Sequence, residues 1–540
     1  MWLVAVLLML GEFLVFDRMT ARFHAHVYPR WTDQTQYLSD AYSGYENLRS
    51  TGFWHGLKAT LSASVPQGKL HDVLAVLVFW VLGGPSRSAA LSLNLLAFLA
   101  WQAALLAVIP RVTGSRTLGW MAFGLLPCLA WPWAVNAGSA VDFRLDHGAM
   151  CLMGVTAAMA LLTRGYRSAG WSAAFGAAVG LTIVERFLTG TYFTVIFAAS
   201  GIWVLCGESR ILRLRHLLGA ALVAVVIAGP MFWLNRAGIY NYYWGGQMVS
   251  AEGNARAPGL DVGESLQFIA GHLGSDQLGP WFCWAAAALT VALLSAFAHG
   301  RRAVSGVDRN GLFFALAFLL LPAAVLCLHR QKSAFVLGIL VPGVLLLILW
   351  VWTVLWPRIG FGVKHPAGRW FPVLLAAAAV AAGEGYFLEC QFAPPLSDQF
   401  VAGAARINQL ADYLFVTART AGLTQPRLGT DQLTDTLDAR TMSVLCYERQ
   451  KIWLPFSTEL PTGIVSQKDE LILDRLGECD FVLLTDRMVG NGHYPYDQQM
   501  RRLYPVLKQW CETHLRRVET FPLFDREISL YQRRTLPAQR

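Results

Sequence analysis

Charged residues are scarce in this chain. Asp, Glu, Lys and Arg make up 15% of its 540 residues, and hydrophobic residues make up 55%. A soluble globular chain is typically about 25% charged and about 45–50% apolar, so an ordinary water-soluble protein is excluded and we expect lipid to be the main solvent. The net charge of +9 does not indicate a nucleic-acid partner, because the basic residues form short clusters between apolar runs, as in the cytoplasmic loops of membrane proteins.

Several motifs with known chemistry are missing. The nine cysteines form no CxxC pair and no Cys/His ligand spacing, so the sequence does not support a zinc site. The C-terminal tail has no GxGxxG motif and no P-loop, and no internal repeat is evident, which weakens a transporter built from inverted repeats. Sequence alone cannot pair the four cysteines in or beside the tail: Cys390, Cys446, Cys479 and Cys511.

Long apolar runs dominate the first 390 residues. A membrane-spanning helix needs about 20 mainly apolar residues. The run 70–84 is apolar over only about 13 residues, a length typical of an interfacial or re-entrant segment. The sequence therefore predicts a polytopic α-helical membrane protein with about eleven spans: 1–16, 87–109, 118–135, 148–163, 169–185, 187–206, 217–234, 281–298, 311–328, 333–356 and 371–388.

Arginine and lysine in alternate loops predict the orientation. If 70–84 does not cross the membrane, five successive loops on one side are basic, as the positive-inside rule requires of cytoplasmic loops. We therefore expect an integral plasma (inner) membrane protein with a cytoplasmic N-terminus and an extracytoplasmic C-terminus. The outer side then carries three loops, two short connections and a tail: 17–86, 136–147, 185–186, 235–280, 329–332 and 389–540.

The tail differs from the rest of the chain. Helical patterns at 404–420 and 497–517 alternate with strand-like runs at 481–485 and 528–531, which is typical of a small α/β domain. We expect residues 1–388 to form a membrane module and residues 389–540 to form a soluble extracytoplasmic α/β domain.

Polar residues of the outer loops are the candidates for chemistry. Asp33 lies in the segment 31–38 (WTDQTQYL), where a helix N-cap is the alternative explanation. Asp142 and Asp146 lie in a charged turn before a predicted span, where the alternative is a solvated turn with a helix cap. Tyr243 and Trp244 belong to an aromatic group that an interfacial aromatic belt would also explain.

Charged side chains beside or within the predicted spans form a second group. Glu12 and Glu384 lie inside spans, which makes them functional candidates unless they reach the surface. For cations at the outer boundary, snorkelling to the interface is the alternative, and Arg186 has the further alternative of an ion pair with the adjacent Glu185. These cations are Lys69, Arg186, Arg330 and Lys332.

The order of these segments resembles the GT-C glycosyltransferases of the protein-mannosyltransferase and lipid A aminoarabinose-transferase type, in glycosyltransferase family 39. There an Asp-Glu-x-x-Tyr-type motif in the first outer loop precedes a Lys-Pro-Pro-Leu-type segment, a short apolar helix and a glycine-containing turn. Gln34 replaces the frequent second acid, which argues against metal binding in this loop, and Lys69 lacks the following prolines. The likeness covers residues 33–37, 66–69, 70–84, 84–86, 141–146, 180–186 and 330–332.

The resemblance implies an inverting glycosyltransferase that moves a sugar from a polyprenyl-phosphate donor to an extracytoplasmic lipid, glycan or protein acceptor. It implies that Asp33 is the general base and Asp146 a second acid. The cations named above would hold the lipid phosphate, and the substrate would be lined by Asp142, Tyr243 and Trp244. No cofactor follows from the sequence, and a divalent metal has no support of its own. A transporter or flippase of a lipid-linked glycan and a non-catalytic membrane scaffold are the alternatives.

Overall fold

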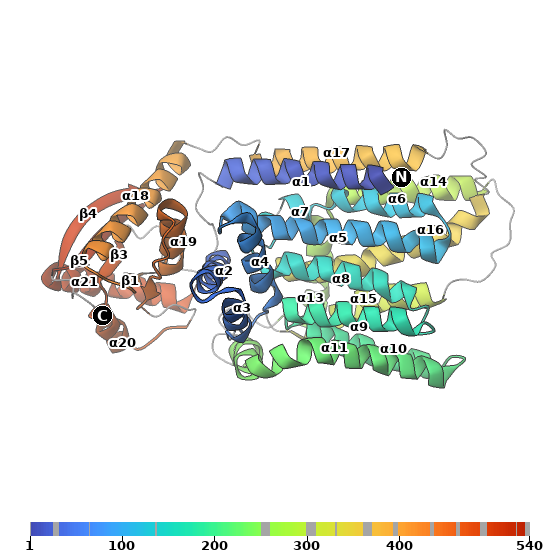
Figure 1. Cartoon of the computed structure of the whole chain (residues 1–540), viewed down its shortest axis with the longest axis horizontal. Helices are drawn as coiled ribbons and strands as arrows, with labels where there is room; N and C mark the ends of the chain where they lie inside the picture. The colour runs from blue at the N-terminus through green and yellow to red at the C-terminus, as the bar shows by residue number, and fades with distance from the viewer. Residues whose placement is uncertain are drawn as a thin grey trace.

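The computed structural model describes residues 2–24, 32–63, 65–134, 138–249, 260–298, 309–329, 332–359, 370–392, 398–431, 437–460, 465–486, 494–524 and 526–534. Most of these residues are helical. A long bundle of helices, aligned with the long axis of the molecule, is followed by a smaller region that contains a β-sheet (Figure 1). We call residues 398–534 the C-terminal region.

Each of the eleven predicted spans overlaps a helix of the bundle. Within the described residues, six helical segments are long and apolar enough to cross a membrane, and α9 and α10 are shorter apolar helices. This confirms a helical membrane protein with several spans. The helices are α1 (Trp2–His24), α5 (Arg87–Thr113), α6 (Arg116–Leu125), α8 (Leu145–Leu162), α9 (Ala169–Glu185), α10 (Thr189–Leu205), α11 (Arg210–Ile239), α14 (Gly279–Ala298), α15 (Arg309–Leu328), α16 (Val341–Ile359) and α17 (Phe371–Phe392).

The predicted span 118–135 is not one continuous helix, and here the prediction is wrong. α6 ends at Leu125, a 3-10 turn η1 (Leu126–Cys128) follows, and α7 (Trp131–Ala134) is a single turn. Pro127 lies in the 3-10 turn, where it has no N–H to donate and its ring would clash with the preceding helical turn. Apolar composition cannot reveal such a break, because every residue of the run still suits a lipid environment.

Small residues allow α9 and α11 to pack closely. A Cβ atom on Gly176 would lie 2.2 Å from the carbonyl oxygen of Ala220, and a Cβ atom on Gly180 would lie 2.7 Å from Cβ of Ile227. Two glycines four residues apart let helix backbones approach each other within a membrane. This contact fixes the end of α9, where Glu185 and Arg186 lie, relative to α11.

Three helices lie across one end of the bundle: α2 (Thr32–Thr51), α3 (Phe53–Ser62) and α4 (Leu70–Leu82). Because α4 does not run along the bundle (Figure 1), its orientation agrees with the prediction that 70–84 does not cross the membrane. It exposes large apolar side chains, among them Trp80, Val81 and Leu82, as an interfacial helix would. Shorter elements complete the bundle: η2 (Tyr240–Val249), α13 (Val262–His272), η3 (Leu273–Leu278) and η4 (Ala334–Leu340).

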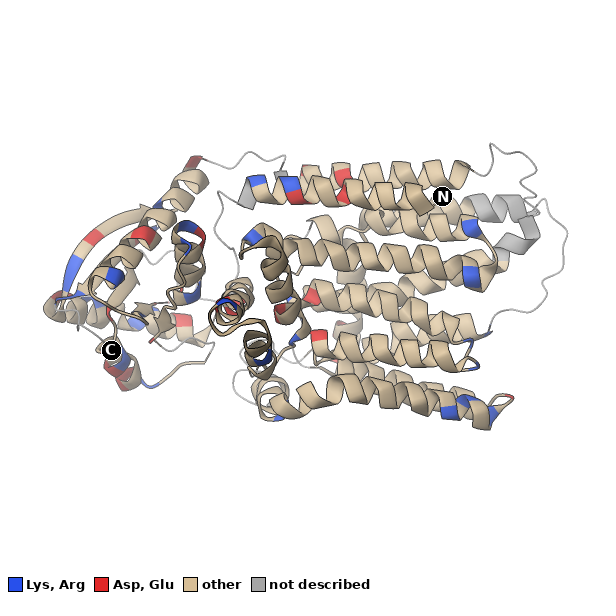
Figure 2. Cartoon of the chain, in the orientation of Figure 1, with Lys and Arg blue, Asp and Glu red and all other residues tan. Residues whose placement is uncertain are grey.

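The two ends of the bundle differ in charge. Lys and Arg gather at the end remote from α2–α4, where few acidic residues occur, whereas the end that α2–α4 cover carries both acidic and basic residues (Figure 2). The N-terminus lies at the remote, basic end, and the C-terminus lies in the C-terminal region beyond α2–α4 (Figure 1). This is the separation that the predicted orientation requires.

The C-terminal region contains a five-stranded mixed sheet in the order β2-β1-β3-β5-β4. β1 is parallel to β2 and β3, and β5 is antiparallel to β3 and β4. Phe481 and Leu483 of β3 pack with α18 and α19, while Val482 and Leu484 pack with α20 and α21, so helices cover both faces. The elements are α18 (Asp398–Thr420), β1 (Arg427–Thr430), α19 (Ala439–Gln450), β2 (Ser457–Thr458), α20 (Asp469–Leu476), β3 (Phe481–Thr485), α21 (Pro495–His514), β4 (Leu515–Leu523) and β5 (Arg526–Arg533).

Two details of the tail can be compared with the sequence predictions. The predicted strand 481–485 is β3, which confirms it, whereas the predicted helix 497–517 ends at His514 because the chain continues into β4. All nine cysteines are free thiols.

Candidate functional site

Asp33 lies in the first turn of α2 and faces the bundle end. Its side chain is 63% exposed, and its Oδ2 lies 3.3 Å from Nη1 of Arg144. The same guanidinium places Nε 2.9 Å from Oδ2 of Asp142 and lies over the ring of Phe335, 5.4 Å from the centroid. Arg144 therefore links an exposed carboxylate, which solvent and a ligand can reach, to a buried one.

Asp142 is the buried anchor of this arrangement. Its carboxylate accepts hydrogen bonds from the backbone N–H of Gly138 at 2.6 Å and from Nε2 of Gln34 at 2.9 Å. Burial raises the pKa of Asp142 to about 6, although Arg144 and these hydrogen bonds oppose the shift. The Nδ2 amide of Asn94 in α5 donates to the carbonyl of Asp142 at 2.8 Å and to that of Ala140 at 3.1 Å. The turn before α8 is thus fixed from both sides.

These contacts explain the glutamine at position 34. The Gln34 side chain donates to a buried carboxylate, which an acid at the same position could do only when protonated. Asp142 was predicted to line the substrate, yet it is fully buried beneath Gln34 and Arg144. A direct substrate contact by Asp142 stays a prediction.

Arg186 pairs with Asp146. The guanidinium follows the last turn of α9 and contacts the carboxylate in the first turn of α8, and both side chains are mostly buried. The alternative ion pair with Glu185 is wrong, because the Oε1 atom of Glu185 instead lies 3.1 Å from Nδ1 of His71. The Nε of Arg186 has no hydrogen-bond partner among the described residues. The pair thus brings two predicted site residues together and leaves one guanidinium donor unused.

Aromatic hydroxyls surround this guanidinium. Tyr37 from α2, Tyr192 from α10 and Tyr243 from η2 all lie within electrostatic range of Arg186. The hydroxyl of Tyr192 is buried and has no partner among the described residues. Trp244, next in the chain, is exposed. The predicted lining residue Tyr243 is thus beside the predicted cation Arg186, whereas Trp244 faces away from the protein.

Lys69 is close to the same junction but is itself buried. Its Nζ lies 3.4 Å from Oδ2 of Asp72, one turn along α4. The backbone around it pairs with the end of α9: the N–H of Lys69 donates to the carbonyl of Val184 at 2.7 Å, and the N–H of Phe187 donates to the carbonyl of Gln67 at 2.8 Å. Lys69 therefore lies near Arg186 through backbone pairing, while its ammonium already has a carboxylate partner.

The remaining predicted cations are not brought to the site in the same way. The ammonium of Lys332 donates to the carbonyls of Leu326 and Cys327 at 2.7 and 2.9 Å, and to that of His329, so it caps the C-terminus of α15. Burial lowers its pKa. Arg330 lies outside the described residues. A phosphate-binding role for Lys332 stays a prediction.

An apolar groove begins at this junction. It has a cavity volume of about 670 Å³ and lies between α10 and α11, and Phe187, Leu188 and Tyr243 line it together with Phe193 and Phe232. The first two directly follow Arg186 in the chain. Arg236 is the charged residue of its lining, which is otherwise mostly apolar.

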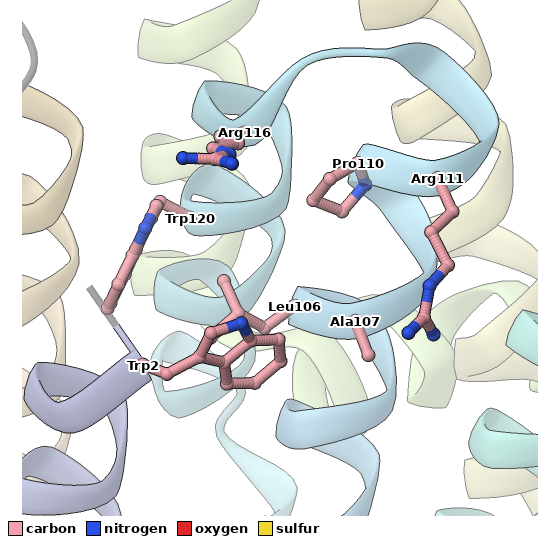
Figure 3. Close-up of a pocket in the computed structure, with 7 residues that line it drawn as sticks. All are labelled: Trp2, Leu106, Ala107, Pro110, Arg111, Arg116 and Trp120. Atoms are coloured by element: carbon pink, nitrogen blue, oxygen red, sulfur yellow. The ribbon is translucent and has the colours of Figure 1, made fainter.

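A second pocket, of about 350 Å³, lies at the opposite end of the bundle. Figure 3 shows Arg111, Arg116, Trp2 and Trp120 around it, contributed by α1, α5 and α6. It is remote from α2 and the carboxylates described above, so it is not part of the candidate site. Among the described residues, no group of three or more His, Cys, Asp and Glu side chains is placed to hold a metal ion.

Sequence reasoning missed four contributors. Arg144 was part of the charged turn but was not assigned a role, and Gln34 and Asn94 were treated as a departure and as part of a span. Tyr37 could have been found, because it follows Asp33 by one helical turn and therefore shares a face with it. The others depend on contacts between segments far apart in the chain.

No protein-family model and no curated protein matches this chain. Among solved structures, it is similar to ArnT from Cupriavidus metallidurans in the apo state, with a TM-score of 0.56, 15% sequence identity and coverage of 97% of each chain. The same protein bound to undecaprenyl phosphate gives a TM-score of 0.55 at the same identity and coverage. ArnT is a membrane glycosyltransferase of the GT-C superfamily. At this identity the likeness concerns the fold, and it confirms the GT-C-like fold predicted from the sequence.

Proposed function

We propose, from the fold shared with ArnT, that this chain is an integral-membrane GT-C glycosyltransferase that uses a polyprenyl-phosphate-linked sugar. The observation that supports the proposal is an apolar groove of about 670 Å³ lined by Phe187, the residue after Arg186, and by Arg236. Asp33 lies in α2, which crosses one end of the bundle. An isoprenoid chain needs an apolar surface, and its phosphate needs a cation at the edge of that surface. The undecaprenyl phosphate in the ArnT structure has this chemistry.

In this proposal the donor phosphate binds at Arg186. Asp146 orients one side of the guanidinium, and the unpartnered Nε together with the buried hydroxyl of Tyr192 supplies donors for phosphate oxygens. A guanidinium suits this task because its planar fork matches phosphate geometry. The developing negative charge on the leaving phosphate is stabilised by these donors. Lys69 would join only if the phosphate displaced Asp72 from its ammonium.

Asp33 is the general base in this proposal. Its exposed carboxylate accepts the proton of an acceptor hydroxyl, while the sugar passes from the phosphate to that oxygen with inversion at the anomeric carbon. Arg144 lies beside this carboxylate, and the buried Asp142 balances the charge of Arg144. The acceptor can be a lipid, a glycan or a protein.

We further propose eleven spans, a cytoplasmic N-terminus and an extracytoplasmic C-terminal domain from residue 389. The charge difference between the two bundle ends supports this orientation. Reporters active only in the cytoplasm, fused after residues 116, 215, 369 and 540, provide the test. We expect activity at the first three positions and none at 540, and the reverse result would invert the orientation.

A gene deletion separates the transferase from a transporter. Lipids extracted from the deletion strain are analysed by mass spectrometry for polyprenyl-phosphate sugars and for the sugars of the envelope acceptors. A transferase predicts that one polyprenyl monophosphate sugar accumulates and that one acceptor loses that sugar. Loss of the donor from the outer leaflet, together with no sugar transfer by the purified protein in vesicles, would favour the transporter.

A further inference from the structure

The first turns of α2 contact the C-terminal region directly. Oγ1 of Thr35 donates to Oδ2 of Asp438 at 3.3 Å, and Nη1 of Arg440 donates to Oε1 of Gln36 at 3.1 Å. Asp438 is the N-cap of α19, so its carboxylate is itself held by the start of that helix. These contacts lie two and three residues after Asp33 in the same helix.

Consecutive residues of α2 thus have partners on two different sides. Asp33 and Gln34 contact the turn before α8 through Arg144 and Asp142, and the next two residues contact α19. Asp33 itself is held by one exposed ion pair, which contributes little to its position. The orientation of its carboxylate therefore depends on how α2 as a whole is held.

A second contact to α19 lies about two turns further along α2. The carboxylate of Glu448 accepts the hydroxyl of Tyr42 at 2.8 Å and lies 3.0 Å from Nε of Arg87, the first residue of α5, at both oxygens. Tyr42 is fully buried, and its ring packs edge-on against Phe79 of α4 and Tyr447 of α19. One carboxylate of the C-terminal region thus joins α2 to the start of a bundle helix.

We propose that α19 is a positioning element for the reaction, and that Glu448 acts by fixing α2 so that Asp33 faces the donor site. This inference rests on the proposed function. Arg87 is mostly buried. Its bidentate pair with Glu448 is geometrically specific, because a planar guanidinium donates both hydrogen bonds to a carboxylate in one orientation. The C-terminal region therefore contributes to the transfer step without touching donor or acceptor.

The proposal predicts a change in turnover with little change in donor binding. Glu448→Gln keeps the size of the side chain and a hydrogen-bond acceptor for Tyr42 but removes the charge that pairs with Arg87. Small displacements of a catalytic group lower rates by up to about 100-fold, so we expect kcat to fall roughly 10- to 100-fold while the KM for the donor changes by less than about twofold.

Two variants control for damage to the fold. Glu519→Gln makes the same change in another ion pair of the C-terminal region, with Arg406, and should leave kcat unchanged. Tyr42→Phe removes only the hydroxyl that Glu448 accepts, so it should fold normally and lower kcat in the same direction by a smaller factor.

The experiment measures donor KM and kcat of the full-length protein in nanodiscs for wild type, these variants, Asp33→Asn and the double variant Asp33→Asn/Glu448→Gln. If Glu448 acts through Asp33, the second substitution has no further effect in the Asp33→Asn background. If the two substitutions lower kcat by factors that multiply in the double variant, or if Glu448→Gln leaves kcat unchanged, the positioning role of Glu448 is overturned while the proposed base stands. Unchanged transfer by Asp33→Asn would instead overturn the proposed base.

Discussion

Replacing Asp33 by Asn provides the sharpest test of the site. The change is nearly isosteric and removes only the charge of a carboxylate in the first turn of α2. A general base contributes about 10²–10⁴-fold to the rate, which corresponds to roughly 2.7–5.4 kcal/mol of activation free energy. We therefore expect the transfer rate of Asp33→Asn to fall by that factor.

The structure predicts only a small effect of the same change on stability. Asp33 is 63% exposed, and its partner Arg144 retains the buried Asp142. An exposed ion pair contributes about 0–1 kcal/mol, and an acidic residue in the first turn of a helix contributes roughly 0.3–1 kcal/mol. The loss of stability should therefore not exceed about 2 kcal/mol, which is less than the predicted loss in activation free energy.

The assay follows sugar transfer by purified protein in nanodiscs, together with thermal unfolding and donor binding for each variant. Asp398→Asn is the matched control, because Asp398 is also an exposed acid in the first turn of a helix but lies in α18. It should leave transfer unchanged. Near-normal transfer by Asp33→Asn would eliminate Asp33 as the base and favour the transporter.

Three further predictions concern the neighbouring residues. Arg186→Lys should raise the KM for the donor at least about tenfold in steady-state kinetics with the fold intact, because an ammonium lacks the planar fork, and an unchanged KM would place the phosphate elsewhere. Gly68→Ala should destabilise the protein by roughly 1–3 kcal/mol or more in thermal unfolding, because its Cβ would lie 1.8 Å from the carbonyl oxygen of Glu185. Gly84→Ala is the control and should leave stability unchanged, because its Cβ would have nothing within 4 Å. Burial raises the pKa of Asp142 to about 6, so the folded protein holds a proton that the unfolded chain releases, and stability should fall as pH rises from about 4 to 6. Asp142→Asn should remove that part of the fall in a comparison of unfolding midpoints, and an identical pH profile would contradict the raised pKa.

Local patterns in the sequence were sufficient for most secondary structure. Apolar runs predicted the helices of the bundle because burial in lipid depends on composition over about 20 residues. The short run 70–84 was predicted not to cross because of its length, and α4 lies across the bundle end. Pro127 broke one predicted span, since backbone hydrogen bonding overrides an otherwise suitable composition at that point.

The pairing of charges could not be read from adjacency. Glu185 and Arg186 are neighbours in the chain, but the end of α9 directs them to different partners, His71 and Asp146. Lys69 was predicted as a free cation, and only the folded chain brings Asp72 to its ammonium within a buried turn. The desolvation cost of an unpaired buried charge determines these partners, because only a counter-charge that the packing places within reach can offset it.

The sequence by itself determined that this is a helical membrane protein, which segments form most of its long apolar helices, and which bundle end collects the basic loops. These properties depend on the solvation of each segment and hence on local composition. Only the tertiary structure decided that Asp33 meets Arg144, that Arg186 pairs with Asp146, and that α19 holds α2. These contacts join residues tens to hundreds of positions apart, and they form because helices pack at fixed spacings and buried polar groups must be paired.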